Sequence, residues 1–447
     1  MQPGEALPTL NTRNEFGLAL LRNYFPEYRL SPSGGEPQTV ISKPLGPIVE
    51  EFKHFIENNG EVFAGFNTMF DQAPKPKDGD LRKIENYLDL LDAFDTLLGA
   101  PPVYAEDGLA AMVAGVPFYG ILARFCNTPA GYNIFTHPGV NERFHRMFSQ
   151  YHDFLGSPAS RTVLNTGDNG WLSDKAQASA VEHAGGPPDA EKFPDYYVCD
   201  TEDPHYGYES YDAYFVRELK ASKRAVICPD DPTIINSPCS AEFHMTHSPL
   251  KELEKFWVKK TPYSLRQMLG NHQFTSDFVG GYLIQAMLAS RDYHRWRSPI
   301  EGIVEDTQLI PGTYYASRLL IPPSADPDPS TPSTPTDDPD PVSRSMDFVS
   351  QISTRALIFI RSKEIGLVCF VGVGLGEIST CKIVVEKGQR LAKGDELGHF
   401  HFGGSTFCLL FGPHIEVTPL FDTTKKIKFR VGQDMLKVAL RPGINRN

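Results

Sequence analysis

The spacing of the apolar residues changes about two-fifths of the way along the chain, and this change restricts the fold more than any other feature. In the first part, apolar side chains recur every three or four residues, as one face of a helix requires. The stripes are Ile48-Phe52-Phe55-Ile56, Leu81-Ile84-Tyr87-Leu88-Leu91-Phe94-Leu98 and Phe144-Met147-Phe148-Tyr151-Leu155. We expect the helix of the first stripe to end at Asn59-Gly60. After Gly185-Gly186-Pro187-Pro188 the apolar runs become short, as at 356–361, 367–371 and 383–386. Gly, Pro, Asn and Asp separate these runs, which is typical of strands and turns.

The change in spacing predicts a boundary near residue 185. A chain of 447 residues, 40% of them apolar, has room for one large or two ordinary cores. We therefore expect a helical N-terminal domain at 1–185 and a second domain at 186–447. Within the second domain, residues 322–341 contain eight prolines, five aspartates and six serines or threonines, but no large apolar side chain. Such a segment predicts a mobile acidic surface loop, because it cannot bury enough surface to offset its ordering entropy.

Composition limits the partners and the compartment. The formal net charge is −12, which disfavours nucleic acid and anionic membrane surfaces as partners. The seven cysteines lie far apart without a Cys-x-x-Cys pair, which argues against a disulfide framework or a zinc ribbon. Residues 1–21 show no apolar signal-peptide core, and the apolar run 108–123 is too short to span a bilayer. We expect a cytoplasmic protein that does not bind membranes.

One stretch near the C-terminus combines strand-like alternation with an interruption by Gly-Gly-Ser-Thr. It reads Leu397-Gly398-His399-Phe400-His401-Phe402-Gly403-Gly404-Ser405-Thr406-Phe407, so the two histidines share one face and Phe400 and Phe402 the other. Composition alone favours a turn or bulge at Gly-Gly-Ser-Thr. The order also permits a reaction, since the Ser405 hydroxyl can attack the Gly404 carbonyl and convert the amide into an ester. Elimination and hydrolysis then leave a pyruvoyl group at position 405.

Further motifs, taken with this stretch, resemble one known family. They are Ser210-Tyr211-Asp212-Ala213-Tyr214-Phe215-Val216-Arg217, Ser290-Arg291-Asp292-Tyr293-His294-Arg295-Trp296-Arg297-Ser298-Pro299 and Gly376-Glu377-Ile378-Ser379-Thr380-Cys381. Together they resemble the phosphatidylserine decarboxylases, which form a pyruvoyl group at a Gly-Ser-Thr site. The version Phe-His-Phe-Gly-Gly-Ser is similar to the fungal branch that decarboxylates aromatic amino acids. The resemblance covers most of the chain. It implies an α+β fold, with a helical N-terminal domain before a mainly antiparallel β-domain, and a pyruvoyl cofactor formed from Ser405.

Two positions depart from the family pattern. The Ser-Pro-x-Asp-Gly segment of the family has its aspartate where this chain has Ser240, and the second histidine of the Asp-Tyr-His-Arg-x-His motif is Arg297 here. A serine activated for attack needs a base of near-neutral pKa and a partner that orients this base. We expect His294 first and His401 second as the base in self-cleavage, and one of the two as the group that protonates the substrate carbon.

Aromatic residues beside the site suggest the substrate. Phe402 or Phe407 would line an apolar pocket for an indole or phenol ring, although aromatic residues on strands more often belong to the core. The resemblance therefore implies a carboxy-lyase for a small aromatic L-amino acid, most simply L-tryptophan giving tryptamine and CO2. The fragments 1–404 and 405–447 are expected to stay associated after cleavage.

Other interpretations remain open. A phosphatidylserine decarboxylase should present a membrane-binding surface, which the charge of −12 disfavours. A non-catalytic scaffold protein of the same family would stay uncleaved, and the two departures support this alternative. His399 and His401 also have the spacing of two metal ligands on one strand, but no glutamate follows three or four residues later, so we expect no metal.

Overall fold

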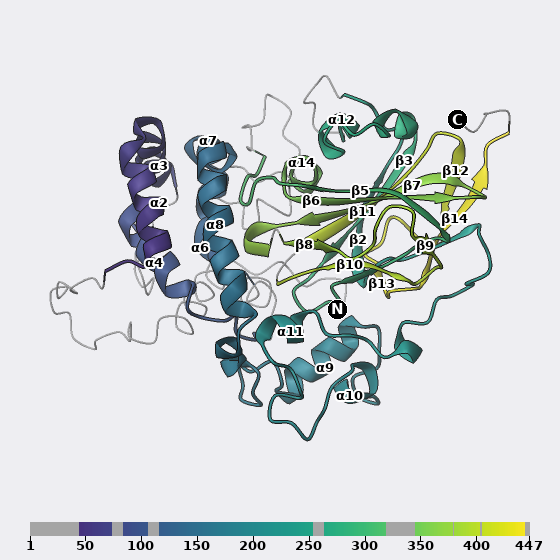
Figure 1. Cartoon of the computed structure of the whole chain (residues 1–447), viewed down its shortest axis with the longest axis horizontal. Coiled ribbons are helices and arrows are strands. Elements are labelled where there is room, and N and C mark those ends of the chain that lie inside the picture. Colours follow the sequence, from purple (N-terminus) through teal and green to yellow (C-terminus); the bar gives the residue numbers. More distant parts are fainter. Residues whose placement is uncertain are drawn as a thin grey trace.

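The structure is a computed structural model, and it describes residues 44–73, 84–105, 116–253, 263–318, 345–378, 380–402 and 405–442. Helices make up the N-terminal half and antiparallel strands most of the C-terminal half (Figure 1). This arrangement confirms the expected α+β fold. The predicted acidic loop 322–341 and Gly404 lie outside the described residues.

Among the described residues, six α-helices form the N-terminal layer. They are α2 (Pro47–Asn58), α3 (Gly60–Gln72), α4 (Tyr87–Leu97), α6 (Pro117–Cys126), α7 (Pro129–Thr136) and α8 (Pro138–Leu155). Proline opens four of them, because its missing N–H leaves no intrahelical hydrogen bond unmade in the first turn. The stripes around residues 91 and 148 become α4 and α8, as predicted. Asn59 does end α2, but its side chain also caps α3, a helix that the sequence pattern missed.

The helical part continues past the predicted boundary. It adds η1 (Pro158–Val163), α9 (Asp174–His183), α10 (Phe193–Tyr196), α11 (Tyr211–Phe215) and η2 (Ala221–Lys223). The boundary motif at 185–188 lies between α9 and α10. Ala180 and Phe193, from the two sides of this motif, belong to the same hydrophobic cluster. A division of the chain into domains at residue 185 stays a prediction.

An eight-stranded antiparallel sheet is the centre of the C-terminal half, with the order β13-β2-β3-β11-β7-β6-β5-β9. Its strands are β2 (Ala241–His247), β3 (Tyr282–Leu288), β5 (Gly302–Ile310), β6 (Arg355–Ser362), β7 (Gly366–Gly374), β9 (Arg390–Leu391), β11 (Ser405–Phe411) and β13 (Lys428–Phe429). Two three-stranded sheets, β4-β10-β8 and β1-β14-β12, flank it. They consist of β1 (Ile234–Asn236), β4 (Arg295–Arg297), β8 (Cys381–Ile383), β10 (Glu396–Phe400), β12 (Ile415–Pro419) and β14 (Asp434–Leu440). Short helices connect the strands: α12 (Leu265–Met268), η3 (Thr275–Phe278), α14 (Met346–Ile352) and η5 (Gly376–Ile378).

Strand β11 is the central strand of the large sheet, and all seven of its residues are buried. Positions 407, 409 and 411 belong to one hydrophobic core, while 408 and 410 belong to a second, as the two-residue period of a strand requires. Its first residue, Ser405, pairs with Leu288 of β3 on one side and with Gly374 of β7 on the other. Neighbouring strands therefore hold Ser405 in place from both sides.

Helix α8 lies between the outer helices and the ends of the strands (Figure 1). It is joined to the strand half by polar contacts to the segment after β5. Asn141 Oδ1 accepts a hydrogen bond from the Tyr314 backbone N–H at 3.1 Å, and His145 Nδ1 is 3.0 Å from the Tyr314 hydroxyl. The position of α8 matters for function because this helix forms one wall of the site described next.

Candidate active site

The Ser405 hydroxyl is buried without a hydrogen bond. The residue is 1% exposed, and its Oγ has no partner among the described residues. The neighbouring hydroxyl behaves differently, since Thr406 Oγ1 donates to the Ala286 carbonyl at 2.8 Å and accepts from Gln285 Nε2 at 3.0 Å. A buried polar group without a partner is uncommon and calls for a functional explanation. Ser405 is therefore free to react, whereas Thr406 is held by structural bonds.

His401 is oriented by a carboxylate. Its Nδ1 lies 2.9 and 3.1 Å from the two carboxylate oxygens of Asp212, which belongs to α11. Because a carboxylate only accepts, the Nδ1 atom carries the proton and Nε2 is left with a lone pair. Burial would raise the pKa of Asp212, but the hydrogen bond that His401 donates opposes this effect, and the pKa of Asp212 lies below its ordinary value. His401 thus belongs to a histidine–carboxylate pair four residues before Ser405.

Local structure explains how Asp212 reaches this position. Ser210 caps α11 by accepting a hydrogen bond from the Ala213 N–H at 3.0 Å, which starts the helix just before the aspartate. On the other side, the His401 N–H donates to the Thr380 carbonyl at 3.1 Å. Asp212 and His401 are 189 residues apart in the chain. No spacing rule could have paired them, and the sequence analysis missed Asp212 as a site residue.

His294, the first candidate for the base, lies in different surroundings. It is 1% exposed, its ring centroid is 4.1 Å from that of Phe215, and its Nε2 is 3.1 Å from the Ala289 carbonyl oxygen. Because the Ala289 carbonyl only accepts hydrogen bonds, the Nε2 atom that faces it carries the proton. The Nδ1 atom has no partner among the described residues. Burial lowers the pKa of His294 to about 3, so the ring is neutral. Ala289 directly follows Leu288, which pairs with Ser405, so His294 approaches the serine from β3.

The aspartate of the same motif has a structural position. Asp292 is fully buried, accepts from the Ala289 N–H at 2.7 Å, is 2.7 Å from His183 Nδ1 and pairs with Lys428 Nζ. Burial opposes ionisation, but Lys428 and His183 together hold the pKa of Asp292 well below its usual range. These contacts fix the loop that carries His294.

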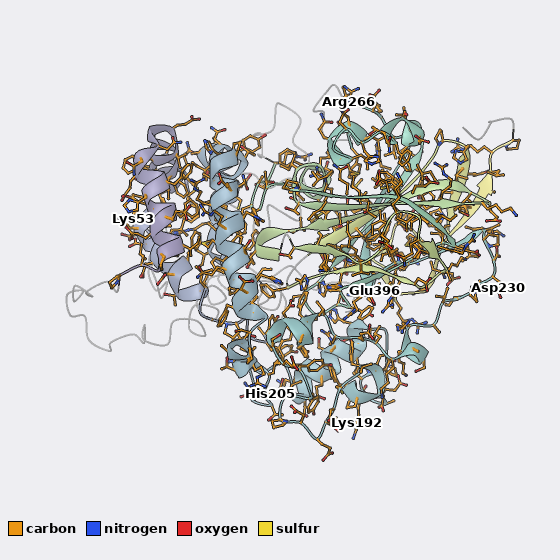
Figure 2. The ribbon with its side chains drawn as sticks, viewed as in Figure 1. Lys53, Lys192, His205, Asp230, Arg266 and Glu396 are labelled. Atoms are coloured by element: carbon orange, nitrogen blue, oxygen red, sulfur yellow. The ribbon has the colours of Figure 1, made fainter. Side chains whose placement is uncertain are left out.

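The two departures from the family pattern provide no base. Ser240 is fully buried, and its hydroxyl accepts a hydrogen bond from the Val431 N–H at 3.4 Å. Arg297 donates to the Tyr293 hydroxyl at 2.9 Å and lies 3.6 Å from a carboxylate oxygen of Glu396. Figure 2 shows Glu396 between the strands and the α9–α11 helices. Glu218, from the segment after α11, lies 3.8 Å from Arg297 and 3.5 Å from Arg295, so this guanidinium belongs to an ion-pair network that joins the strands to the helical part.

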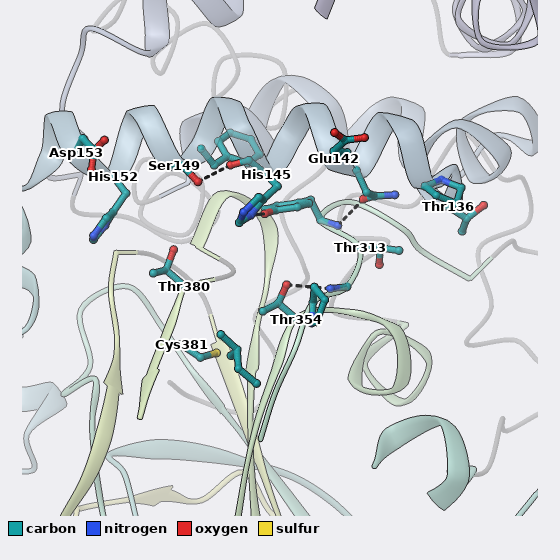
Figure 3. A pocket seen from close by; sticks show the side chains of 17 residues that line it. Thr136, Glu142, His145, Ser149, His152, Asp153, Thr313, Thr354, Thr380 and Cys381 are labelled. Carbon is teal, nitrogen blue, oxygen red and sulfur yellow. Dashed lines mark hydrogen bonds between the residues drawn. The ribbon is translucent and has the colours of Figure 1, made fainter. Parts of the chain in front are cut away.

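A cavity of about 780 Å³ opens between α8 and the strand half (Figure 3). Its lining residues come from the end of α7 through α8, the segment after β5 and the starts of β6 and β8: Thr136, Pro138, Asn141, Glu142, His145, Phe148, Ser149, His152, Asp153, Leu309, Pro311, Gly312, Thr313, Tyr314, Thr354, Thr380 and Cys381. A much smaller cavity adjoins it, lined by Phe148, Tyr151, His152, Leu155, Glu377, Thr380, His401 and Phe402. Phe148, His152 and Thr380 line both cavities. The larger cavity thus adjoins His401 and Phe402, which come shortly before the Gly404–Ser405 peptide bond in sequence.

The two predicted substrate-binding aromatics lie in different places. Phe402 lines the small cavity, and its ring packs edge-on against Tyr151 and Tyr211. Phe407 is fully buried in the sheet core, where it stacks on Phe370, and it lines neither cavity. Gly404 and Gly403 lie outside the described residues.

Glu377 is a further site residue that the sequence analysis quoted in a motif without assigning it a role. Its buried carboxyl accepts hydrogen bonds from the Phe118 N–H at 3.0 Å and the Tyr315 hydroxyl at 2.8 Å. Burial raises the pKa of Glu377 to about 7. It lines the small cavity together with His401.

Comparisons with known proteins identify the family of the chain. A family model described as phosphatidylserine decarboxylase matches residues 211–437, and a second model for phosphatidylserine decarboxylase matches residues 46–180. The chain therefore belongs to the phosphatidylserine decarboxylase family and is a decarboxylase of this type.

Among named relatives, decarboxylase iboD of Amanita muscaria is 35% identical over 72% of this chain and 93% of its own length. L-tryptophan decarboxylase of Psilocybe cubensis is 34% identical over 81% of this chain and 79% of its own length. Phosphatidylserine decarboxylase proenzyme 3 of Schizosaccharomyces pombe is 30% identical, but over 50% of this chain and 21% of its own length. No helix in the described part of the chain has the length and apolar character needed to cross a membrane.

Proposed function

We propose that this chain is a self-processing, pyruvoyl-dependent decarboxylase of an aromatic L-amino acid, which converts L-tryptophan to tryptamine and CO2. The observation that carries the proposal is the buried hydroxyl of Ser405, which has no hydrogen-bond partner among the described residues. Ser405 directly follows Gly404 in sequence and stands four residues after His401, the histidine paired with Asp212. The relative from Psilocybe cubensis is an L-tryptophan decarboxylase, and this supports L-tryptophan as the substrate. The size of the main cavity supports a small molecule.

In self-processing, His401 acts as the base. Its Nε2 takes the proton of the Ser405 hydroxyl while the oxygen attacks the Gly404 carbonyl, and the Gly404–Ser405 amide becomes an ester. Asp212 stabilises the imidazolium that forms, which is the usual role of the carboxylate in such a group of three. Elimination releases the Gly404 carboxylate and leaves a dehydroalanine, and water then replaces its nitrogen by oxygen with release of ammonia.

The pyruvoyl group so formed supplies an electron sink for the electrons of the bond that breaks when CO2 leaves. The chain's own residues bind and orient the amino acid. Phe148 and Phe402 offer apolar walls for an indole, and the cavity places such a ring within reach of His401 and Thr380. Excluding water from this pocket favours decarboxylation over side reactions.

The two histidines have different roles in this proposal. His294 donates its single N–H to the Ala289 carbonyl, so it has no proton to give. Its free Nδ1 is suited to accept a hydrogen bond from the substrate nitrogen. His401 gains a proton at Nε2 whenever it acts as a base, and it can return this proton to the substrate carbon. We therefore assign protonation to His401 and substrate positioning to His294.

Both fragments remain together in this proposal. After cleavage, 405–447 begins with β11, which pairs with β3 and β7 of the larger fragment. The same fragment supplies β13, paired with β2, and β14, paired with β1. Separating the fragments would expose the centre of the sheet, which carries a large hydrophobic penalty.

The test is the intact mass of wild-type protein beside Ser405→Ala, with Thr406→Ser as a matched control that keeps the adjacent hydroxyl. We expect wild type and control to split into 1–404 and 405–447, with the smaller fragment lighter by the change from serine to pyruvoyl. The Ser405→Ala chain should stay whole. Processed protein is then assayed with L-tryptophan, L-tyrosine, L-phenylalanine and phosphatidylserine vesicles. Turnover of the vesicles alone would favour a lipid substrate, and an intact wild-type chain would favour the scaffold alternative.

A further inference from the structure

Three side chains near Ser405 come together with the composition of a transition-metal site. They are His152 from α8, Asp212 from α11 and His401, and one ligand atom from each lies within 4.8 Å of the others. The rings of His152 and His401 have centroids 4.6 Å apart. Two imidazoles and one carboxylate suit Zn²⁺ and related divalent ions, since these metals prefer nitrogen and oxygen ligands of this kind.

The three ligand atoms have to move slightly closer together to bind one ion. Metal–ligand bonds of roughly 2.0–2.2 Å place neighbouring ligand atoms roughly 3–3.5 Å apart in a tetrahedral site. The 2.9 Å between His401 Nδ1 and Asp212 is already close to this spacing. His152 has to move toward the pair, and its ring has room to do so because it points from α8 into the cavity, toward Thr380 (Figure 3). The cavity also gives an ion a route of entry and leaves a fourth ligand position for water.

We propose that His152, Asp212 and His401 form a binding site for a divalent transition metal such as Zn²⁺, and that a bound metal keeps the chain unprocessed. The second part rests on the proposed function, in which His401 accepts the Ser405 proton. Whichever ring nitrogen of His401 binds the metal, the other nitrogen carries the proton, so no lone pair remains for Ser405. A bound metal also compensates the negative charge of the Asp212 carboxylate, which would otherwise stabilise the imidazolium.

Binding is measured on the full-length Ser405→Ala chain, because this variant cannot process and its binding does not depend on the reaction. Zn²⁺ is titrated by calorimetry, and Co²⁺ is used to record the visible absorption of a tetrahedral site. Adding His152→Asn should weaken Zn²⁺ binding at least about tenfold and abolish the Co²⁺ spectrum. The matched control is His145→Asn, from the same helix and cavity but outside the group of three, and it should bind as the parent does. Equal binding by both variants would overturn the site.

Processing is then followed with and without Zn²⁺, and each variant is compared only with itself in metal-free buffer. We expect Zn²⁺ to slow cleavage of the wild-type chain and of His145→Asn at least about tenfold, with recovery after chelation. His152→Asn should be cleaved at the same rate with and without Zn²⁺. Equal Zn²⁺ inhibition of the two histidine variants would refute regulation by this site. A wild-type chain that never cleaves in metal-free buffer contradicts the proposed function instead, and the binding measurement still decides the metal site.

Discussion

The surroundings of His294 and His401 differ, although both histidines are connected to the Ser405 region. His294 bonds to Ala289, which follows the strand partner of Ser405, and His401 stands four residues before Ser405. His401 has a carboxylate partner and lines a cavity, whereas His294 is sealed against Phe215 with one nitrogen unpaired. Phe402 contacts both surroundings, since its ring centroid is 5.8 Å from that of Phe215 and it lines the small cavity together with His401. The difference teaches that a carboxylate partner makes a histidine suited to act as a base, whereas burial without such a partner keeps the ring neutral.

The largest expected effect comes from removing the carboxylate from the His401 pair. Asp212→Asn should slow self-cleavage by roughly 10³-fold or more, because the amide no longer stabilises the imidazolium and favours the wrong tautomer. The rate is measured by the appearance of fragment 405–447 in a gel or mass spectrum. The control is Asp153→Asn, which removes a carboxylate that lines the large cavity beside His152 and does not bond to His401. Comparable rates for Asp212→Asn and wild type would remove the distinction between the two histidines.

The second effect concerns Glu377, across the small cavity from His401. Its pKa of about 7 in the folded chain exceeds the ordinary value of 4.5, so the folded state holds this proton between these two values while the unfolded chain releases it. Wild-type stability should therefore fall as the pH rises through this window, by about 3 kcal/mol in total. Glu377→Gln lacks this penalty, because its amide does not ionise.

Urea unfolding of wild type and Glu377→Gln at pH 5 and pH 8 checks this prediction. The stability of the variant relative to wild type should be higher at pH 8 than at pH 5. Loss of the hydrogen bonds from Phe118 or Tyr315 would change the relative stability by the same amount at pH 5 and at pH 8. A relative stability that does not change with pH would mean that Glu377 stays ionised, like the paired Asp292.

A third prediction separates the two histidines directly. His294→Leu should still be processed, because the Asp212–His401 pair is intact, but its decarboxylation rate should fall roughly 10²-fold through loss of a substrate hydrogen bond. Cleavage and tryptamine formation are measured on the same preparation. If cleavage is lost while the fold is retained by circular dichroism, then His294 is the base and the assignment of roles is reversed.

The smallest effect is expected at the two aromatic residues. Phe402→Leu should raise KM for L-tryptophan a few-fold, because its ring borders the cavity, and a lost apolar contact is worth about 1 kcal/mol. Phe407→Leu should leave KM unchanged and lower the free energy of unfolding by about 1 kcal/mol, since its ring stacks on Phe370 in the core. Steady-state kinetics and urea unfolding of both variants test this. A KM change at Phe407 alone would place the substrate on the other side of β11.

Much of the fold follows from periodicity alone. The stripe at 144–155 becomes α8, and the runs at 356–361 and 367–371 become β6 and β7, because a helix and a strand each repeat at their own period. The run at 383–386 is only partly correct, since β8 ends at Ile383. The helices after residue 185 escaped prediction because they are short and their stripes are broken by Pro, Gly and Asp.

By itself, the sequence determined the order of helices and strands and pointed to Ser405, since local patterns and a motif in one stretch carry this information. Only the tertiary structure decided which groups accompany the serine. Asp212 reaches His401 across 189 residues of chain, and Glu377 lines the same small cavity as His401. Phe402 also lines this cavity, whereas Phe407 does not. Burial keeps the His294 ring neutral and Asp212 orients the His401 ring, and both effects arise from packing between segments that sequence spacing does not relate.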